Sequence, residues 1–132
     1  HKGVFACGNV LHVHDLVDYV TLEAQLAGQG AAEYILSESA KETEYVTPET
    51  GNGVRYLVPQ KVNIKNGNDV KLYFRVGQIY KNARVVLECD GEIISSKKKV
   101  KLAPGEMENV VIPAATLAKM NSDSTITVRV EE

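Results

Sequence analysis

The pattern that most constrains this chain is an alternation of apolar and polar residues that begins at Val54 and runs towards the C-terminus. In residues 70–76 (VKLYFRV) every second side chain is apolar, as in a strand that buries one face. Comparable stretches occupy residues 54–58, 62–64, 84–89, 100–102, 107–112 and 124–130. About seven short strands at roughly ten-residue spacing predict an immunoglobulin-like antiparallel β-sandwich over residues 54–132.

Turn residues separate these stretches. Asp90-Gly91 lies between two alternating segments and predicts a two-residue hairpin. Residues 66–69 (NGND) and 103–105 (APG) predict further turns. Residues 114–120 follow Pro113 and predict a short helical turn before the last strand.

Before residue 45 the period is that of a helix, and we expect one over residues 18–36. Its predicted face comprises Val20, Ala24, Ala27, Ala31, Tyr34 and Ile35. Gly28 and Gly30 each weaken a helix by about 1 kcal/mol relative to alanine. Small side chains around them make a smooth face, which suits close packing against a sheet or another backbone segment. Asp15 and Asp18 provide negative charge near the unpaired N–H groups of the helix start.

Residues 41–53 are polar, acidic and interrupted by Pro48, Gly51 and Gly53, which is typical of a linker. The chain therefore divides into residues 1–40, a linker over residues 41–53, and a β-rich domain over residues 54–132. The fold class that we predict is mainly β.

Composition narrows the classes of partner. A net charge of −2 over 132 residues gives no reason to expect nucleic acid. No apolar run approaches the roughly 18–20 residues of a membrane span. Cys7 and Cys89 are far apart and form no C-x-x-C pair, so we expect free thiols and a cytoplasmic location.

A family resemblance is carried by residues 3–9 (GVFACGN), which predict a buried strand ending at a tight glycine turn, and by LEAQLAGQGAAEYI in the helix. Together they resemble the second FAD-contacting motif of the pyridine nucleotide-disulfide oxidoreductases, the thioredoxin-reductase-like flavoproteins, with the pattern G-[IVL]-[FY]-A-x-G-D. The chain looks most like the bacterial NAD(FAD)-dependent dehydrogenases. The resemblance covers roughly residues 3–36, about a quarter of the chain.

The resemblance implies FAD and NAD(P)H as cofactors and five FAD-contacting residues. Backbone at Gly8 would approach the flavin closely, since glycine has no side chain to obstruct it. Asn9 stands where the family has an aspartate that accepts a hydrogen bond from a ribityl hydroxyl; its amide oxygen still accepts, but one charge is lost. Backbone near Asp18, Tyr19 and Val20 would direct the positive helix end at the flavin pyrimidine.

Much of such an enzyme has no counterpart in this sequence. It contains no G-x-G-x-x-G for the FAD pyrophosphate, no second dinucleotide fold and no C-x-x-C. The chain also starts with a predicted strand and without methionine, so we expect the C-terminal region of a longer FAD-dependent NAD(P) oxidoreductase. In that interpretation the helix is left over from an α/β FAD-binding domain, and this piece alone holds no FAD and is catalytically silent.

Two interpretations of the β-rich domain stay open. As an accessory domain, its partners are the remainder of the parent flavoenzyme and, through the sandwich, a second copy or another protein. The alternative is a protein-protein interaction or dimerisation module with no redox role. The dimerisation domain of the better-known family members is an α/β domain, which this β-rich region does not resemble.

The segment His12-Val13-His14-Asp15 has three interpretations: metal ligands, side chains that line the flavin site, or an inert loop. Two histidines and a neighbouring carboxylate lack a distant partner, so we predict no metal site. We also find no catalytic residues, because no nucleophile, base and orienting group have a suitable spacing.

Two other clusters favour structural roles. Lys97, Lys98, Lys99 and Lys101 resemble the lysines that protect an edge strand more than a phosphate-binding or nucleic-acid-binding patch. The tyrosines at 56, 73 and 80 form either an aromatic binding surface or plugs at the rim of a small core, of which the second is commoner.

Overall fold

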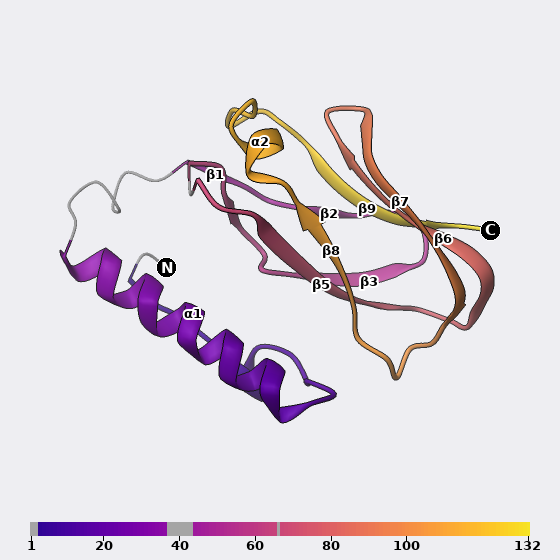
Figure 1. The fold of residues 1–132 in the computed structure, drawn as a ribbon, viewed down its shortest axis with the longest axis horizontal. Helices are drawn as coiled ribbons and strands as arrows, with labels where there is room; N and C mark the ends of the chain where they lie inside the picture. The colour runs from indigo at the N-terminus through magenta and orange to yellow at the C-terminus, as the bar shows by residue number, and fades with distance from the viewer. Residues whose placement is uncertain (1–2, 37–43, 66) are drawn as a thin grey trace. The chain divides into compact units, whose positions relative to one another are not determined.

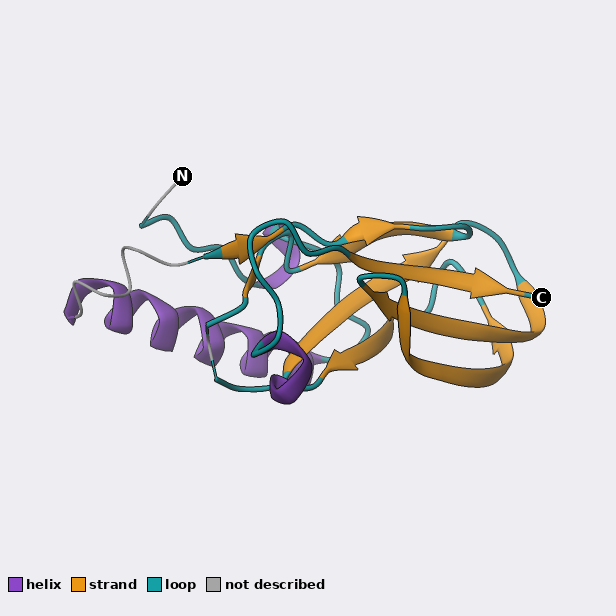
Figure 2. Cartoon of the chain, turned by 90° about the horizontal axis from the view of Figure 1, so that it is seen from above, coloured by secondary structure: helices purple, strands orange, loops and turns teal. Residues whose placement is uncertain are grey.

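The computed structural model describes residues 3–36, 44–65 and 67–132. They belong to two compact units, residues 1–43 and residues 44–132, which we call the N-terminal unit and the β unit. Helix dominates the first and strands dominate the second (Figure 2). No helix in the described residues has both the length and the apolar character that a membrane span requires.

The β unit contains two main sheets and a small one (Figure 1). The four-stranded sheet has the order β2 (Glu49–Thr50), β9 (Ile126–Glu131), β6 (Tyr80–Cys89) and β7 (Glu92–Leu102). The three-stranded sheet has the order β3 (Val54–Val58), β5 (Val70–Val76) and β8 (Glu108–Ile112). The third sheet pairs β1 (Tyr45–Val46) with β4 (Val62–Asn63), and a short helix, α2 (Ala114–Leu117), precedes β9.

The predicted hairpin between β6 and β7 is confirmed. Cys89 pairs with Glu92, and the two residues between them, Asp90 and Gly91, have φ values of 51° and 81°. A two-residue turn of this type needs positive φ at both positions, which Asp-Gly adopts at little cost. β7 continues to Leu102 as one strand, where the sequence indicated two segments, because it pairs with β6 along its length.

The core of the β unit combines apolar side chains from both main sheets. Leu72 and Phe74 of β5, Leu87 of β6 and Val128 of β9 are fully buried and belong to the same cluster. Alternation in β5 and β9 places their buried side chains on one face, as the period-two pattern predicted, whereas β6 buries three consecutive side chains, Val85, Val86 and Leu87. The fold is mainly β with one main helix, which confirms the predicted class at that level.

The segment predicted as a linker contains two short strands that belong to the sheets. Residues 41–43 lie outside the described residues, but residues 44–53 hold β1 and β2, and β2 pairs in parallel with β9. The N–H of Gly51 donates to the carbonyl of Val128 at 2.8 Å, and the N–H of Val130 donates to the carbonyl of Asn52 at 2.8 Å. Because this pairing uses backbone groups, the exposed polar side chains of β2 did not reveal it.

The N-terminal unit consists of a 3-10 turn, η1 (Gly8–Val10), and α1 (Val17–Leu36). The helix matches the prediction, but the predicted strand over residues 3–6 is wrong: residues 4–7 have no regular secondary structure. A strand needs a neighbour for its backbone groups, and none of the described strands pairs with this segment.

Residues 3–8 lie instead along α1. The Phe5 ring meets the Tyr34 ring edge to face, with centroids 6.1 Å apart. A Cβ on Gly30 would lie 3.3 Å from the Phe5 ring, so glycine makes room for this close approach. Part of the predicted helix face, at Gly30 and Tyr34, therefore packs against another backbone segment, one of the two options predicted from the sequence. Ala24, Gly28 and Ile35 of the predicted face are exposed.

We predict that Phe74→Ala lowers the free energy of unfolding of the β unit by about 3–5 kcal/mol, because it leaves a cavity in a fully buried position. The matched control is Val100→Ala on β7, whose side chain is 83% exposed, with an expected change within about 0.5 kcal/mol. Urea denaturation monitored by circular dichroism measures both. Equal effects would contradict the assignment of the core.

Cys89 adds a pH dependence to this core. Burial, followed by the charges of Asp90, Glu88 and Glu92, raises the pKa of its thiol from 9.0 to about 11. The thiol therefore stays protonated in the folded protein at pH values where it ionises in the unfolded chain. We predict that stability falls as the pH rises from about 9 towards about 11. Urea titrations across this range should show a steeper fall than in Cys89→Ala, whereas Cys7→Ser should keep it; identical slopes in all three would contradict the prediction.

Candidate functional site: a histidine-glutamate cluster beside the predicted flavin contact

Two of the predicted FAD-contacting residues, Gly8 and Asn9, lie in η1. Gly8 has φ of 72°, and its carbonyl accepts the N–H of Leu11 at 2.9 Å. Only glycine adopts this φ readily, so the sequence forces a tight turn where a glycine turn was predicted. Asn9 is exposed, and its Oδ1 accepts the N–H of His14 at 3.4 Å, a long hydrogen bond.

The other three predicted residues, Asp18, Tyr19 and Val20, lie in the first turns of α1. A Cβ on Gly8 would lie 3.7 Å from the Cγ1 of Val20, so the glycine turn rests against the start of the helix. The carboxylate of Asp18 is exposed in the first turn, where negative charge is favourable. The fold thus brings Gly8 beside Val20.

A single carboxylate, that of Glu23, holds this turn and the following loop to the helix. Its Oε2 accepts the N–H of Gly8 at 2.5 Å. Its two oxygens lie 2.7 Å from the Nε2 of His12 and 2.9 Å from the Nε2 of His14. One helical side chain therefore joins three points of the segment between residues 8 and 14.

The side chains of His12, His14 and Glu23 are largely buried, although most of the described residues around them in the N-terminal unit are exposed. The side chains of His12 and His14 are 3% and 1% exposed, and that of Glu23 is 12% exposed. Burial by itself raises the pKa of the Glu23 carboxyl, but the hydrogen bonds from His14, His12 and the Gly8 N–H outweigh it. The pKa consequently lies below the ordinary value of 4.5, and the carboxylate form is stabilised.

Glu23 is the residue that sequence reasoning missed. The histidines were set aside as metal ligands for want of a distant partner, and Glu23 is that partner, eleven residues from His12. Asp15, the carboxylate considered first, is exposed and does not belong to the group of three. No local pattern in the sequence joins Glu23 to the two histidines, because a loop and the first turns of the helix separate them.

The lysine cluster takes the structural role that we predicted. β7 lies at the end of the four-stranded order, so Lys97, Lys98, Lys99 and Lys101 are on an edge strand. The Nζ of Lys99 lies 2.6 Å from Oε2 of Glu108 on β8, which connects the two main sheets. At least one of these lysines therefore serves the fold.

The three tyrosines do not share one surface. Tyr80 is buried in the core, with its hydroxyl directed towards Gly53. Tyr56 pairs with Arg75 and Tyr73 lies two residues from Arg75, so Tyr56 and Tyr73 share the other face of the three-stranded sheet. The prediction of tyrosines that plug the core is confirmed for Tyr80 alone.

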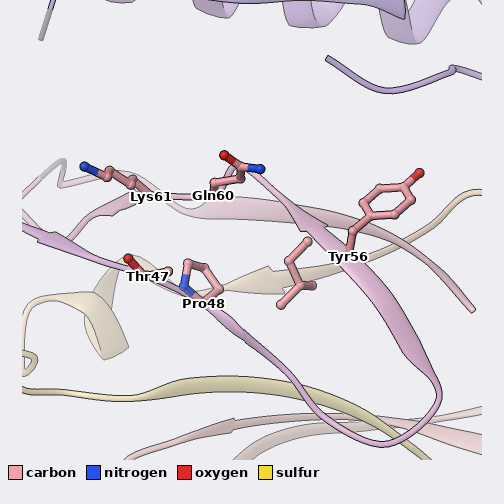
Figure 3. A pocket seen from close by; sticks show the side chains of 6 residues that line it. Thr47, Pro48, Tyr56, Gln60 and Lys61 are labelled. Carbon is pink, nitrogen blue, oxygen red and sulfur yellow. The ribbon is translucent and has the colours of Figure 1, made fainter. Parts of the chain in front are cut away.

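A shallow hollow of about 380 Å³ lies near Tyr56. Its lining consists of Thr47, Pro48, Tyr56, Leu57, Gln60 and Lys61. Figure 3 shows the Tyr56 ring pointing away from Thr47 and Pro48, so these side chains do not converge on a common point. Lys61 is the one charged residue of the lining, so the hollow does not contain a group of charged side chains that could act together on a ligand.

Comparisons with known proteins add no relative. No protein-family model matches the chain, and neither a curated protein nor a solved structure matches it with significance.

We predict that Glu23→Gln loosens the turn at Gly8, because a neutral amide replaces the carboxylate that accepts three hydrogen bonds. The exchange of the Gly8 amide proton, followed by NMR, should be about tenfold faster or more, since bonds to a charged group contribute roughly 1.5–3 kcal/mol. Glu33→Gln on the same helix is the control, because its carboxylate is exposed and accepts a hydrogen bond from the side chain of Gln29 instead of holding the turn at Gly8. Equal exchange rates in the two variants would contradict the role of Glu23.

Proposed function

We propose that this chain is the C-terminal region of an FAD-dependent NAD(P) oxidoreductase, in which residues 3–36 complete the FAD site. The intact enzyme passes a hydride between a nicotinamide and FAD and then to an acceptor. The family is that of the pyridine nucleotide-disulfide oxidoreductases, to which the GVFACGN segment and the following helix are similar. This chain by itself is catalytically silent.

The observation that carries the proposal is the apolar surface of the N-terminal unit. Large apolar side chains are exposed throughout it, including Val10 at 85%, Val17 at 77% and Leu26 at 68%. Among its described residues none of the apolar side chains is buried; the buried one is His12. An exposed surface of this kind marks a place where further polypeptide packs, as the rest of an FAD-binding domain would.

The local geometry is compatible with a cofactor contact. Gly8 presents backbone without a side chain, the amide of Asn9 is exposed, and both lie beside the start of a 20-residue helix. The positive end of a helix dipole stabilises the negative charge that a reduced flavin carries. Glu23 then acts as a positioning residue, since it fixes Gly8 relative to that helix end.

We assign the β unit to an immunoglobulin-like accessory domain of a cytoplasmic enzyme. The chain leaves the three-stranded sheet after β5, returns with β8 and leaves again for β9, and connections of this kind are typical of that class. Two free cysteines favour a reducing compartment.

A second candidate function, an interaction module without a redox role, is favoured by β7. This 11-residue edge strand exposes Val100 and Ile93, the latter at 55%. An edge strand presents backbone donors and acceptors to which a partner strand adds, and the lysines along β7 disfavour a second copy of the same strand as that partner.

The test begins with the coding sequence upstream of residue 1, where a G-x-G-x-x-G after a predicted strand is expected. The intact protein should then carry flavin, visible in its absorbance, that NADH or NADPH bleaches under anaerobic conditions. Asn9→Ala should lower the flavin content, whereas Asn68→Ala in the β unit should leave it unchanged. A reading frame without a dinucleotide motif, or an intact protein without flavin, would contradict the proposal and favour the interaction module.

A further inference from the structure

We propose that His12, His14 and Glu23 bind a divalent transition-metal ion of the zinc type, with two imidazole nitrogens and one carboxylate as ligands. The inference concerns the chain in hand and does not rest on the proposed flavin chemistry. It starts from three donor atoms, one from each residue, that all lie within 4.8 Å of one another.

The donor types fit such an ion. Zinc in proteins takes imidazole nitrogen and carboxylate oxygen at about 2.0–2.2 Å, and three protein ligands leave a fourth position for water. Two nitrogens with one oxygen suit zinc-like ions better than magnesium or calcium, which prefer oxygen alone. The ion class therefore follows from the side chains that the loop and the helix bring together.

The distances allow an ion with small movements. Donors bound to one tetrahedral ion lie roughly 3.3–3.5 Å apart, given metal bond lengths of about 2.0–2.2 Å. The two histidine-to-glutamate distances, 2.7 and 2.9 Å, would open by roughly half an ångström. The widest separation within the group, up to 4.8 Å, would close by roughly 1.3 Å, and side-chain rotation of the histidines provides this movement. On binding, the ion takes the place of the protons that the imidazole Nε2 atoms share with the carboxylate.

The surroundings support the ligands. The N–H of Gly8 donates to Oε2 of Glu23 and orients the carboxylate, as outer-shell donors do at metal centres. The imidazole rings of His12 and His14 lie 4.4 Å apart at 64°, so both Nε2 atoms reach the same carboxylate without stacking. His12 and His14 are two residues apart in an irregular segment, a spacing that directs both rings to one side.

The small size of the N-terminal unit is a separate reason to expect a structural metal ion. It is a 43-residue unit, and its described part buries a histidine but none of its apolar side chains. Units this small rarely bury enough apolar area to be stable, and structural metals are one of the usual compensations. A metal at this cluster would stabilise the contact between the loop and α1.

The experiment is a titration of the chelator-treated 132-residue chain with Co²⁺, followed by visible d–d absorption, and with Zn²⁺ by calorimetry. We expect one equivalent of metal and a tetrahedral cobalt spectrum. Glu23→Gln and His14→Ala should weaken binding at least by the roughly 10- to 100-fold that an outer-shell loss costs. Glu33→Gln and His1→Ala should bind as the parent chain does.

A further variant separates ligand loss from misfolding. His14→Cys replaces an imidazole by a thiolate, which also binds zinc and cobalt, so it should retain the metal. It should also add a sulfur-to-cobalt charge-transfer band that the parent chain, which already contains Cys7 and Cys89, does not show. Far-UV circular dichroism reports whether each variant keeps α1. Absence of one-equivalent binding in the parent chain, or unchanged affinity in Glu23→Gln, would overturn the proposal and leave a purely hydrogen-bonded cluster.

Discussion

The β unit depends on one constraint: apolar side chains from two sheets must fill a single core. Side chains alternate between buried and less buried along β5, β8 and β9, so a shift of one residue in register would turn their apolar side chains to solvent. This fixes the pairings of β5 with β8 and of β6 with β9, and it places Phe74 and Leu87 in the same cluster. The parallel addition of β2 and the ion pair between Lys99 and Glu108 strengthen an arrangement that the core already determines.

The N-terminal unit is organised differently. Its most buried side chains are polar, and one carboxylate holds a glycine turn and two histidines to the helix. The same carboxylate links the two proposals: it positions the predicted flavin-contact turn, and it supplies the anionic ligand for a metal.

Whether an element could be predicted from the sequence depends on whether side chains or backbone groups hold it in place. Side-chain periodicity predicted the strands, the helix and the Asp90-Gly91 hairpin, because these elements depend on side-chain burial or on local turn geometry. It missed β2, whose contacts are made by backbone groups, and β1, which is two residues long and buries a single side chain, Val46. It also predicted a strand at residues 3–6 that has no neighbouring strand among the described residues. It missed Glu23 because the partner of His12 and His14 lies one loop and two helical turns away, and no local pattern encodes that distance.

We infer that residues 44–132 form a self-sufficient fold, whereas residues 3–36 do not. Residue-resolved hydrogen exchange of the metal-free chain distinguishes the two, because protection reports local stability. We expect the amides of β6 to exchange only through global unfolding of the β unit, and those of α1 to exchange orders of magnitude faster. Protection of α1 equal to that of β6 would contradict this inference.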